Sequence, residues 1–153
     1  MLPSIPNPVL LPAVAGTPLP THEQIVRLQS EMLPIQCAQP EPEHIFHDGW
    51  YERRLHVPAG MLIVGKTHRH RHIVGVISGN ALLISKFGRE QVQTGYLSVS
   101  EPGVKRIVLA AEDTLFVTLH ANPSNTRDLD KIEAEHICPE YLFAPSKPNE
   151  VLQ

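Results

Sequence analysis

Three histidines alternate with arginines near the middle of this 153-residue chain. His68, His70 and His72 stand at every second position, and an apolar, β-prone run follows them. Because successive side chains of a β-strand point to opposite faces, a strand here would project all three imidazoles from one face. Imidazole is the commonest metal ligand among side chains. If that face lines a barrel, the run predicts a metal-binding surface, and if it faces solvent, it predicts a basic stripe that responds to pH.

The elements that would position these histidines are short β-strands. Between residues 44 and 121, apolar runs are separated by turn residues such as Asp48-Gly49 and Pro102-Gly103. Many short strands at close and regular spacing predict an all-β sandwich or barrel. We expect strands at 44–47, 50–57, 61–66, 72–77, 80–86, 91–93, 96–100, 105–110 and 114–120.

The N-terminal region is rich in proline: nine of the 15 prolines lie within residues 1–42. Residues 1–20 therefore cannot form a helix or a central strand, and we expect an extended, Pro-rich N-terminal arm. Its apolar residues suit a contact with a neighbouring subunit, and the alternative is a flexible tail. A short helix should follow at residues 21–33, where Thr21 can cap the N-terminus and Gln24 can complete a capping box.

The end of the chain is predicted to leave the sheets. Residues 126–137 fit a second short helix, with Thr126 or Asn125 as its N-cap, and the tail 139–153 should be extended. The predicted organisation has three parts: residues 1–43 form the arm with its helix, residues 44–121 form the barrel, and residues 122–153 form the C-terminal helix and tail.

The bulk composition argues against two classes of function. With a formal net charge of -3 and 19% charged residues, the chain lacks the basic footprint of a nucleic-acid-binding protein. No apolar run approaches the roughly 18 residues of a membrane-spanning helix, so no membrane is expected as a partner. Cys37 and Cys138 are far apart in the sequence, and we interpret both as reduced thiols, which is consistent with the cytoplasm.

The segment from Gly60 to Gly79 resembles the first sequence motif of the cupins. That motif has a glycine, then His-x-His, then a glutamate, and a second glycine seven residues after the glutamate. Counting back from Gly79 places His72 at the glutamate position, His68 near the second histidine and Lys66 near the first. The resemblance implies a cupin-like β-barrel, or jelly roll, with His72 and His68 in ligand-like places.

A second cupin motif, Pro-x-Gly-x-x-His, is approximated by the run from Glu101 to Arg106, where Arg106 replaces the histidine. The order of these blocks also resembles small cupin-like proteins encoded by tailed bacteriophages. Those proteins share a Gly-Lys-x-His-x-x-x-His block, a Pro-Gly-x-Lys-Arg turn and a late strand that ends in histidine, here His120. This second resemblance implies a phage-associated protein, as a virion component.

The metal hypothesis takes His68 and His72 as ligands, with His70 or His120 as the third. Same-face neighbours on a strand lie about 7 Å apart at the backbone, a span that two imidazoles can bridge to one ion. Three histidines with open coordination positions suit one divalent transition metal, namely Zn²⁺, Fe²⁺, Mn²⁺ or Ni²⁺. The alternative is a polar lining in which hydrogen bonds hold the histidines without a metal.

Two cations stand where the cupin pattern has ligands. Lys66 and Arg106 would oppose a metal and would favour an anionic ligand, such as a carboxylate or a phosphate. The alternative is that both point outward as solubilising charges. Arg69 and Arg71 alternate with the histidines, so they should face the opposite side of the strand.

Two functions fit these patterns, and neither a Gly-x-Ser-x-Gly context nor a glycine-rich phosphate loop is present. The first hypothesis is a non-catalytic structural or binding module, homo-oligomeric and phage-associated. Its arm would bind a second copy or other virion proteins, in the host cytoplasm or in the virion. The alternative is a metal-dependent cupin enzyme of the dioxygenase or isomerase type. There, His68, His72 and His120 would bind the metal, and Arg106 or Lys66 would orient a small anionic substrate.

Overall fold

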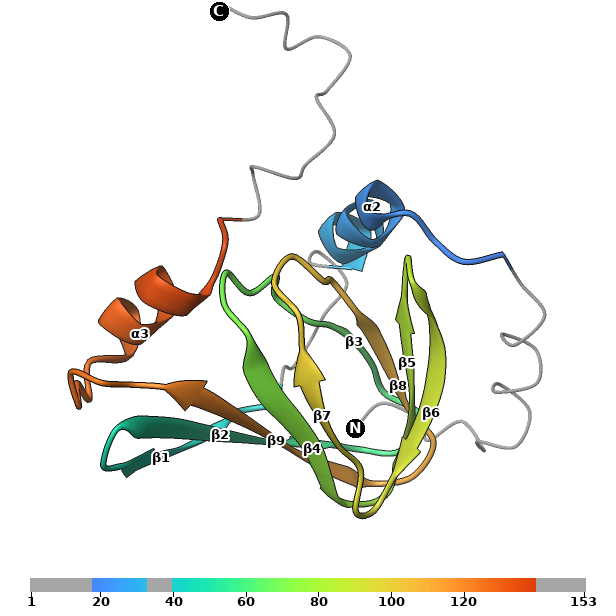
Figure 1. Cartoon of the computed structure of the whole chain (residues 1–153). Coiled ribbons are helices and arrows are strands. Elements are labelled where there is room, and N and C mark those ends of the chain that lie inside the picture. The colour runs from blue at the N-terminus through green and yellow to red at the C-terminus, as the bar shows by residue number, and fades with distance from the viewer. Residues whose placement is uncertain (1–17, 33–39, 140–153) are drawn as a thin grey trace, which may run out of the picture.

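Two antiparallel β-sheets face each other and form the body of the protein (Figure 1). The computed structural model describes residues 18–32 and 40–139, so the arm predicted at residues 1–20 and the tail predicted at 139–153 lie almost wholly outside the described residues. The strand order is β1-β2-β9-β4-β7 in the five-stranded sheet and β3-β8-β5-β6 in the four-stranded sheet. The strands are β1 (Glu43–His47), β2 (Trp50–Val57), β3 (Leu62–Val64), β4 (His72–Ser78), β5 (Asn80–Ser85), β6 (Gly88–Gln93), β7 (Leu97–Ser100), β8 (Ile107–Ala110) and β9 (Thr114–Ala121).

The described residues confirm the predicted all-β jelly roll and each of its predicted strands, with ends that differ by a few residues. Strands β2 and β9 pair residue by residue along their whole length. The strand predicted at 61–66 already ends at Val64, and β4 begins at His72 as predicted, so residues 65–71 form a loop.

Strand β5 shows how side chains that point alternately to the two faces of a strand build the core. Ala81 and Leu83 belong to the apolar cluster between the two sheets. Leu82 and Ile84 point the other way and belong to a second apolar cluster on the outside of the four-stranded sheet. Burying an aliphatic side chain of this kind contributes about 1.5–3 kcal/mol, so both faces of this strand stabilise the fold.

Helix α2 (His22–Met32) covers the outer face of the four-stranded sheet through the buried Ile25. Its predicted capping box is confirmed. The Gln24 amide donates to Thr21 Oγ1 at 3.1 Å, and the Thr21 amide donates to Gln24 Oε1 at 2.9 Å. These two bonds satisfy backbone donors that a helix N-terminus otherwise leaves unpaired.

Helix α3 (Leu129–His136) confirms the second predicted helix, but the prediction of its N-cap is wrong. Asp128 caps the helix, and its carboxylate accepts from the Asp130 amide at 3.1 Å. Thr126 instead accepts from the Asp128 amide at 3.2 Å, and Asn125 adopts a positive φ of 54° in the preceding turn. Neither of the two helices that the structure describes is long and apolar enough to cross a membrane.

The outer face of the five-stranded sheet is apolar near β4 and β7. Ile77, Leu97 and Val99 are 42%, 70% and 54% exposed. Strand pairing sets Val99 beside Ile73 on this face. Helix α2 packs on the other sheet, and among residues 18–32 and 40–139 no element covers this face (Figure 1).

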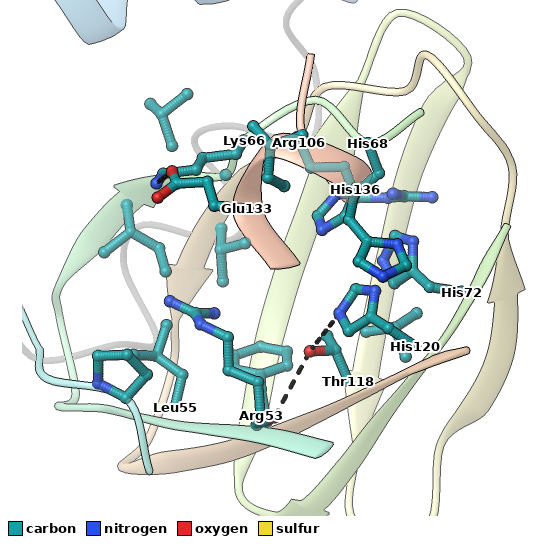
Figure 2. Close-up of a pocket in the computed structure, with 18 of the residues that line it drawn as sticks. Arg53, Leu55, Lys66, His68, His72, Arg106, Thr118, His120, Glu133 and His136 are labelled. Carbon is teal, nitrogen blue, oxygen red and sulfur yellow. Dashed lines mark hydrogen bonds and ion pairs between the residues drawn. The ribbon is translucent and has the colours of Figure 1, made fainter. Parts of the chain in front are cut away.

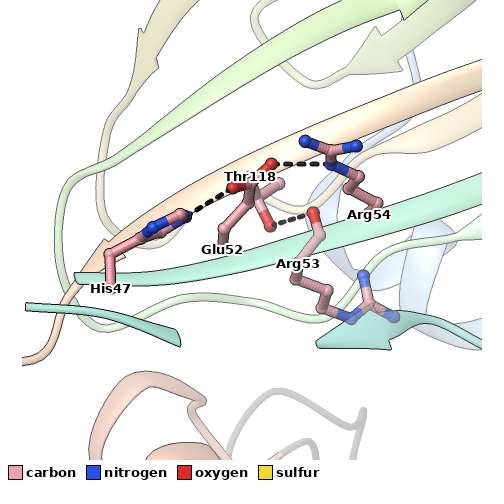
Figure 3. A network of polar contacts seen from close by, with 5 residues as sticks. All are labelled: His47, Glu52, Arg53, Arg54 and Thr118. Carbon is pink, nitrogen blue, oxygen red and sulfur yellow. Dashed lines mark hydrogen bonds and ion pairs between the residues drawn. The ribbon is translucent and has the colours of Figure 1, made fainter. Parts of the chain in front are cut away.

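The opposite part of the same face, near β1, carries a polar network (Figure 3). Glu52 is buried, and its carboxylate accepts from Arg54 Nε at 2.7 Å and lies 2.7 Å from His47 Nε2. The hydrogen bond with His47, helped by Arg54, lowers the pKa of Glu52 despite the opposing effect of burial. The network therefore links β1 to β2 through an ionised carboxylate.

The turn between β4 and β5 should be intolerant of any side chain. Gly79 adopts a φ of +106°, and a Cβ added there would lie 2.4 Å from the Asp113 carbonyl oxygen. We expect Gly79→Ala to lower the free energy of unfolding by about 3 kcal/mol or more, because it adds both backbone strain and a clash.

Gly88→Ala is the matched control, since a Cβ at Gly88 meets nothing within 4 Å and its φ is not positive. Its cost should stay below about 1 kcal/mol. Urea denaturation measures both variants, and equal losses would contradict the role assigned to Gly79.

Candidate metal centre

Two histidines lie side by side on the inner face of the five-stranded sheet. Strands β4 and β9 are neighbours, and Ile73 pairs with Leu119. The residues next to this pair, His72 and His120, therefore share the inner face, and their ring centroids are 4.9 Å apart. Both side chains are buried.

The third histidine reaches the same place from the loop at residues 65–71. The ring of His68 is 4.0 Å from that of His72 and 5.2 Å from that of His120. Each of the three residues offers one ligand nitrogen, and these nitrogens all lie within 4.8 Å of one another. We call His68, His72 and His120 the histidine cluster (Figure 2).

Backbone contacts from distant parts of the chain hold the loop that carries His68. The His68 carbonyl accepts from the Gly103 amide at 3.0 Å, and the Thr67 carbonyl accepts from the Cys138 amide at 2.9 Å. His68 also forms an isolated β-bridge with Ile137, just after α3. The loop therefore pairs with the chain beyond α3 instead of extending β4.

Burial keeps the histidine cluster uncharged. Desolvation is the largest cause that lowers the pKa values of His68, His72 and His120, to about 3, about 4 and about 2. Repulsion from the neighbouring imidazoles lowers the values for His68 and His120 further. At neutral pH each ring therefore has a nitrogen lone pair, which is the form that binds metals.

Two observations show that the donor set fits a metal. The Nδ1 atom of His72 is buried and has no hydrogen-bond partner among the described residues. The Nε2 atom of His120 lies 3.1 Å from Thr118 Oγ1, and the ring stacks on Tyr51 at 5.7 Å (Figure 2). A hydrogen bond at one ring nitrogen fixes the orientation of the ring, as neighbours of metal-ligating histidines do.

The structure leaves His70 outside the histidine cluster. The prediction that the three alternating imidazoles share one strand face is wrong, because β4 begins only at His72. His70 is exposed, and so are Arg69 and Arg71, which do not face the opposite side of a strand. Arg71 forms an ion pair with Glu101 at 2.9 Å.

His136 was missed by the sequence interpretation, and the structure places it next to the cluster. It is 6% exposed, its ring is 5.2 Å from that of His120, and its Nε2 has no partner among the described residues. Helical periodicity could have found it. Its position four residues after Ile132 and seven after Leu129 places it on the same face of α3 as these apolar residues.

The histidine cluster opens into a cavity of about 490 Å³ between the two sheets, with α3 along one side (Figure 2). Lys66 is exposed at this cavity and forms an ion pair with Glu133 of α3. Arg106 is half-buried in the wall and donates to Ser100 Oγ at 2.7 Å. Both predicted anion-binding residues thus border the cavity, and each already has a partner.

Arg53 is a further cavity residue that the sequence interpretation missed. It is half-buried on β2, pairs with Thr118 of β9 and extends into the cavity (Figure 2). Burial lowers its pKa, with weaker opposing effects from Tyr51 and Glu133. Alternation along β2 could have found it, because Tyr51, Arg53 and Leu55 all line the cavity.

Comparison with solved structures identifies the architecture. A protein with a double-stranded β-helix domain from Klebsiella pneumoniae is similar with a TM-score of 0.50 and 19% identity, over 60% of this chain and 84% of that one. The plu4264 protein from Photorhabdus luminescens is similar with a TM-score of 0.50 and 18% identity, over 61% and 85%. The fold is therefore a double-stranded β-helix. A cupin-2 domain protein from Shewanella frigidimarina also matches, with a TM-score of 0.47 and 12% identity over 61% of this chain and 91% of that one.

These identities establish the cupin fold alone. No family model matches the chain, and no curated protein matches it. Of the positions that the cupin motifs picked out, the structure brings His68 and His72 together with His120. It places Lys66 and Arg106 around the cavity beyond them.

Acid should destabilise this cupin fold through the histidine cluster. In the unfolded chain these histidines bind protons below their ordinary pKa of about 6.5, whereas in the folded protein they do so only at lower pH. The free energy of unfolding of metal-free protein should therefore fall as the pH decreases from about 6.5 towards 4.

His120→Gln should make this pH dependence shallower, and His56→Gln, an exposed histidine on β2, should leave it unchanged. Urea denaturation of EDTA-treated protein at several pH values measures both. A slope in His120→Gln as steep as in the wild type would show that the cluster does not titrate as described.

Proposed function

We propose that this chain binds one divalent transition metal through His68, His72 and His120 and acts on a small molecule in the adjoining cavity. The metal would be Zn²⁺, Fe²⁺, Mn²⁺ or Ni²⁺, and of these Zn²⁺, Fe²⁺ and Ni²⁺ suit imidazole ligands best. The observation that carries the proposal is the cluster itself: three neutral imidazoles, two of them buried and that of His68 half-buried, with ligand nitrogens within 4.8 Å of one another.

The energetics of burial favour this function over a purely structural polar lining. A buried polar atom without a hydrogen bond costs about 1–3 kcal/mol, and His72 Nδ1 is such an atom among the described residues. A metal ligand bond would satisfy it. In the structural alternative, hydrogen bonds to neighbouring groups would hold the rings, as the contact of His120 with Thr118 does, and they would leave His72 Nδ1 without a partner among the described residues.

The arrangement around the cluster supports a reactive metal site over a structural one. Three protein ligands beside an open cavity leave coordination positions for a substrate, whereas structural metal sites are closed by four protein ligands. When bound, such a metal supplies Lewis-acid activation, and in the case of iron also redox chemistry. Around it, Thr118 positions the ring of His120, and α3 lines one side of the cavity. This supports the metal-dependent enzyme that was the alternative hypothesis, of the dioxygenase or isomerase type.

Metal content tests the proposal directly. Protein purified without an affinity tag and incubated with each of the four metals should retain about one equivalent of at least one of them after gel filtration. His68→Ala, His72→Ala and His120→Ala should each reduce this several-fold or more, since each removes one ligand.

His70→Ala is the matched control, because His70 is a nearby histidine outside the cluster, and it should retain the metal. Elemental analysis measures all variants. The proposal fails if wild-type protein retains less than about a tenth of an equivalent of every metal, or if His70→Ala loses as much as the cluster variants.

A second candidate function is the homo-oligomeric binding module, and the apolar outer face near β4 and β7 favours it. Large exposed apolar patches on a protein are typical of interaction sites. We propose a second copy of this chain as the occupant, because two such faces can pack apolar against apolar about a two-fold axis. The phage association and the role of the arm stay predictions, since no described residue bears on them.

Mass in solution tests the second candidate. Wild-type protein should have the mass of a dimer or a higher oligomer by light scattering, and Leu97→Glu should shift it towards the monomer by placing a charge in the interface. Phe87→Glu is the control, since Phe87 is equally exposed, at 70%, in the turn between β5 and β6. A monomeric wild type, or an unchanged mass in Leu97→Glu, would exclude this interface.

A further inference from the structure

The geometry points to Arg53 as the residue that binds the carboxylate of a small ligand inside the cavity. The inference rests on the proposed metal function and names the ligand class of that same site. It differs from the sequence-based expectation, which assigned the anion to Lys66 and Arg106.

Arg53 stands at the right place on the inner face of the five-stranded sheet. In the pairing of β2 with β9, Arg53 is opposite Thr118 and Tyr51 is opposite His120. Arg53 is therefore one same-face position away from the level of His120, on the neighbouring strand. The guanidinium extends into the cavity that the histidine cluster borders (Figure 2).

Among the three arginine and lysine side chains that line the cavity, Arg53 is the one that the described residues leave without a direct partner. Lys66 is paired with Glu133, and Arg106 donates to Ser100. The guanidinium of Arg53 has no hydrogen bond or ion pair with any residue in 18–32 or 40–139. Glu133 is near enough to influence Arg53 electrostatically, but its carboxylate already pairs with Lys66.

Partial burial makes a counter-ion favourable at this position. A guanidinium keeps its charge in proteins, so burying it costs solvation energy that only an anion or hydrogen-bond acceptors can offset. The cavity into which it extends is largely apolar, with Leu55, Ile63 and Phe116 in its lining. An anion that enters this cavity therefore gains a strong, poorly screened attraction to Arg53.

A carboxylate fits this environment better than a phosphate. Its two oxygens match the two parallel N–H groups of one guanidinium. Lys66 and Arg106, which could supply further donors to the additional oxygen of a phosphate, already have partners. The ligand would thus carry a carboxylate for Arg53, a short apolar segment along the cavity wall, and a second polar group near the histidine cluster.

Calorimetric titration of the Zn²⁺-loaded protein with the dicarboxylates from oxalate to adipate tests the inference. At least one should bind, and its affinity should fall tenfold or more in Arg53→Leu, because a charge-assisted bidentate contact is lost. Arg54→Leu is the matched control. Arg54 is the next residue on β2, pairs with Glu52 on the outer face and should change the affinity less than about twofold.

Metal content is measured on the same samples. A failure of the proposed metal binding can therefore be distinguished from a failure of the carboxylate assignment to Arg53. If Zn²⁺ loads and no dicarboxylate binds, or Arg53→Leu binds as well as the wild type, the assignment of Arg53 is wrong. If inorganic phosphate binds through Arg53 more tightly than every dicarboxylate, the ligand class is wrong. If neither Zn²⁺ nor any of the other three metals loads, the metal function is wrong, and the same titrations of metal-free protein still decide whether Arg53 binds a carboxylate.

Discussion

Imidazoles whose ring centroids lie 4.0 to 5.2 Å apart in a cavity with apolar walls can be buried together only while all of them are uncharged. The five-stranded sheet holds His72 and His120 on paired strands. The loop at residues 65–71 places His68 beside them. The fold thereby places three lone pairs in one small volume. A divalent cation is the partner that satisfies them without adding a proton.

The two sheets differ in what covers their outer faces, and this difference divides their roles. Helix α2 covers the four-stranded sheet, where Leu82 and Ile84 pack against Ile25. The five-stranded sheet supplies two of the three cluster histidines and Arg53 from its inner face. Its outer face is polar near β1, around Glu52, and apolar near β7. One sheet therefore supports the fold, and the other carries the surfaces at which chemistry and association would occur.

Local patterns predicted most of the fold and about half of the candidate site. The period-two pattern and the turn residues located the strands, and Thr21 with Gln24 located the start of α2. The path of residues 65–71 could not be predicted, because their backbone partners near Ile137 are about 70 residues away in the sequence. His70 therefore seemed equivalent to His68 and His72. Arg53 could have been found from the alternation along β2, and His136 from the helical periodicity of α3. Neither residue lies in a recognised motif.

The loop of His68 and the chain just beyond α3 hold each other in place. The Cys138 amide bonds to the Thr67 carbonyl, and the Arg69 amide bonds to the His136 carbonyl. A proteolytic cut between α3 and Cys138 would therefore remove one backbone bond to the loop of His68 without altering any ligand residue. The residues just beyond α3 would thus be thermodynamically linked to metal affinity at the proposed centre, because they help to hold the loop that carries one of its ligands.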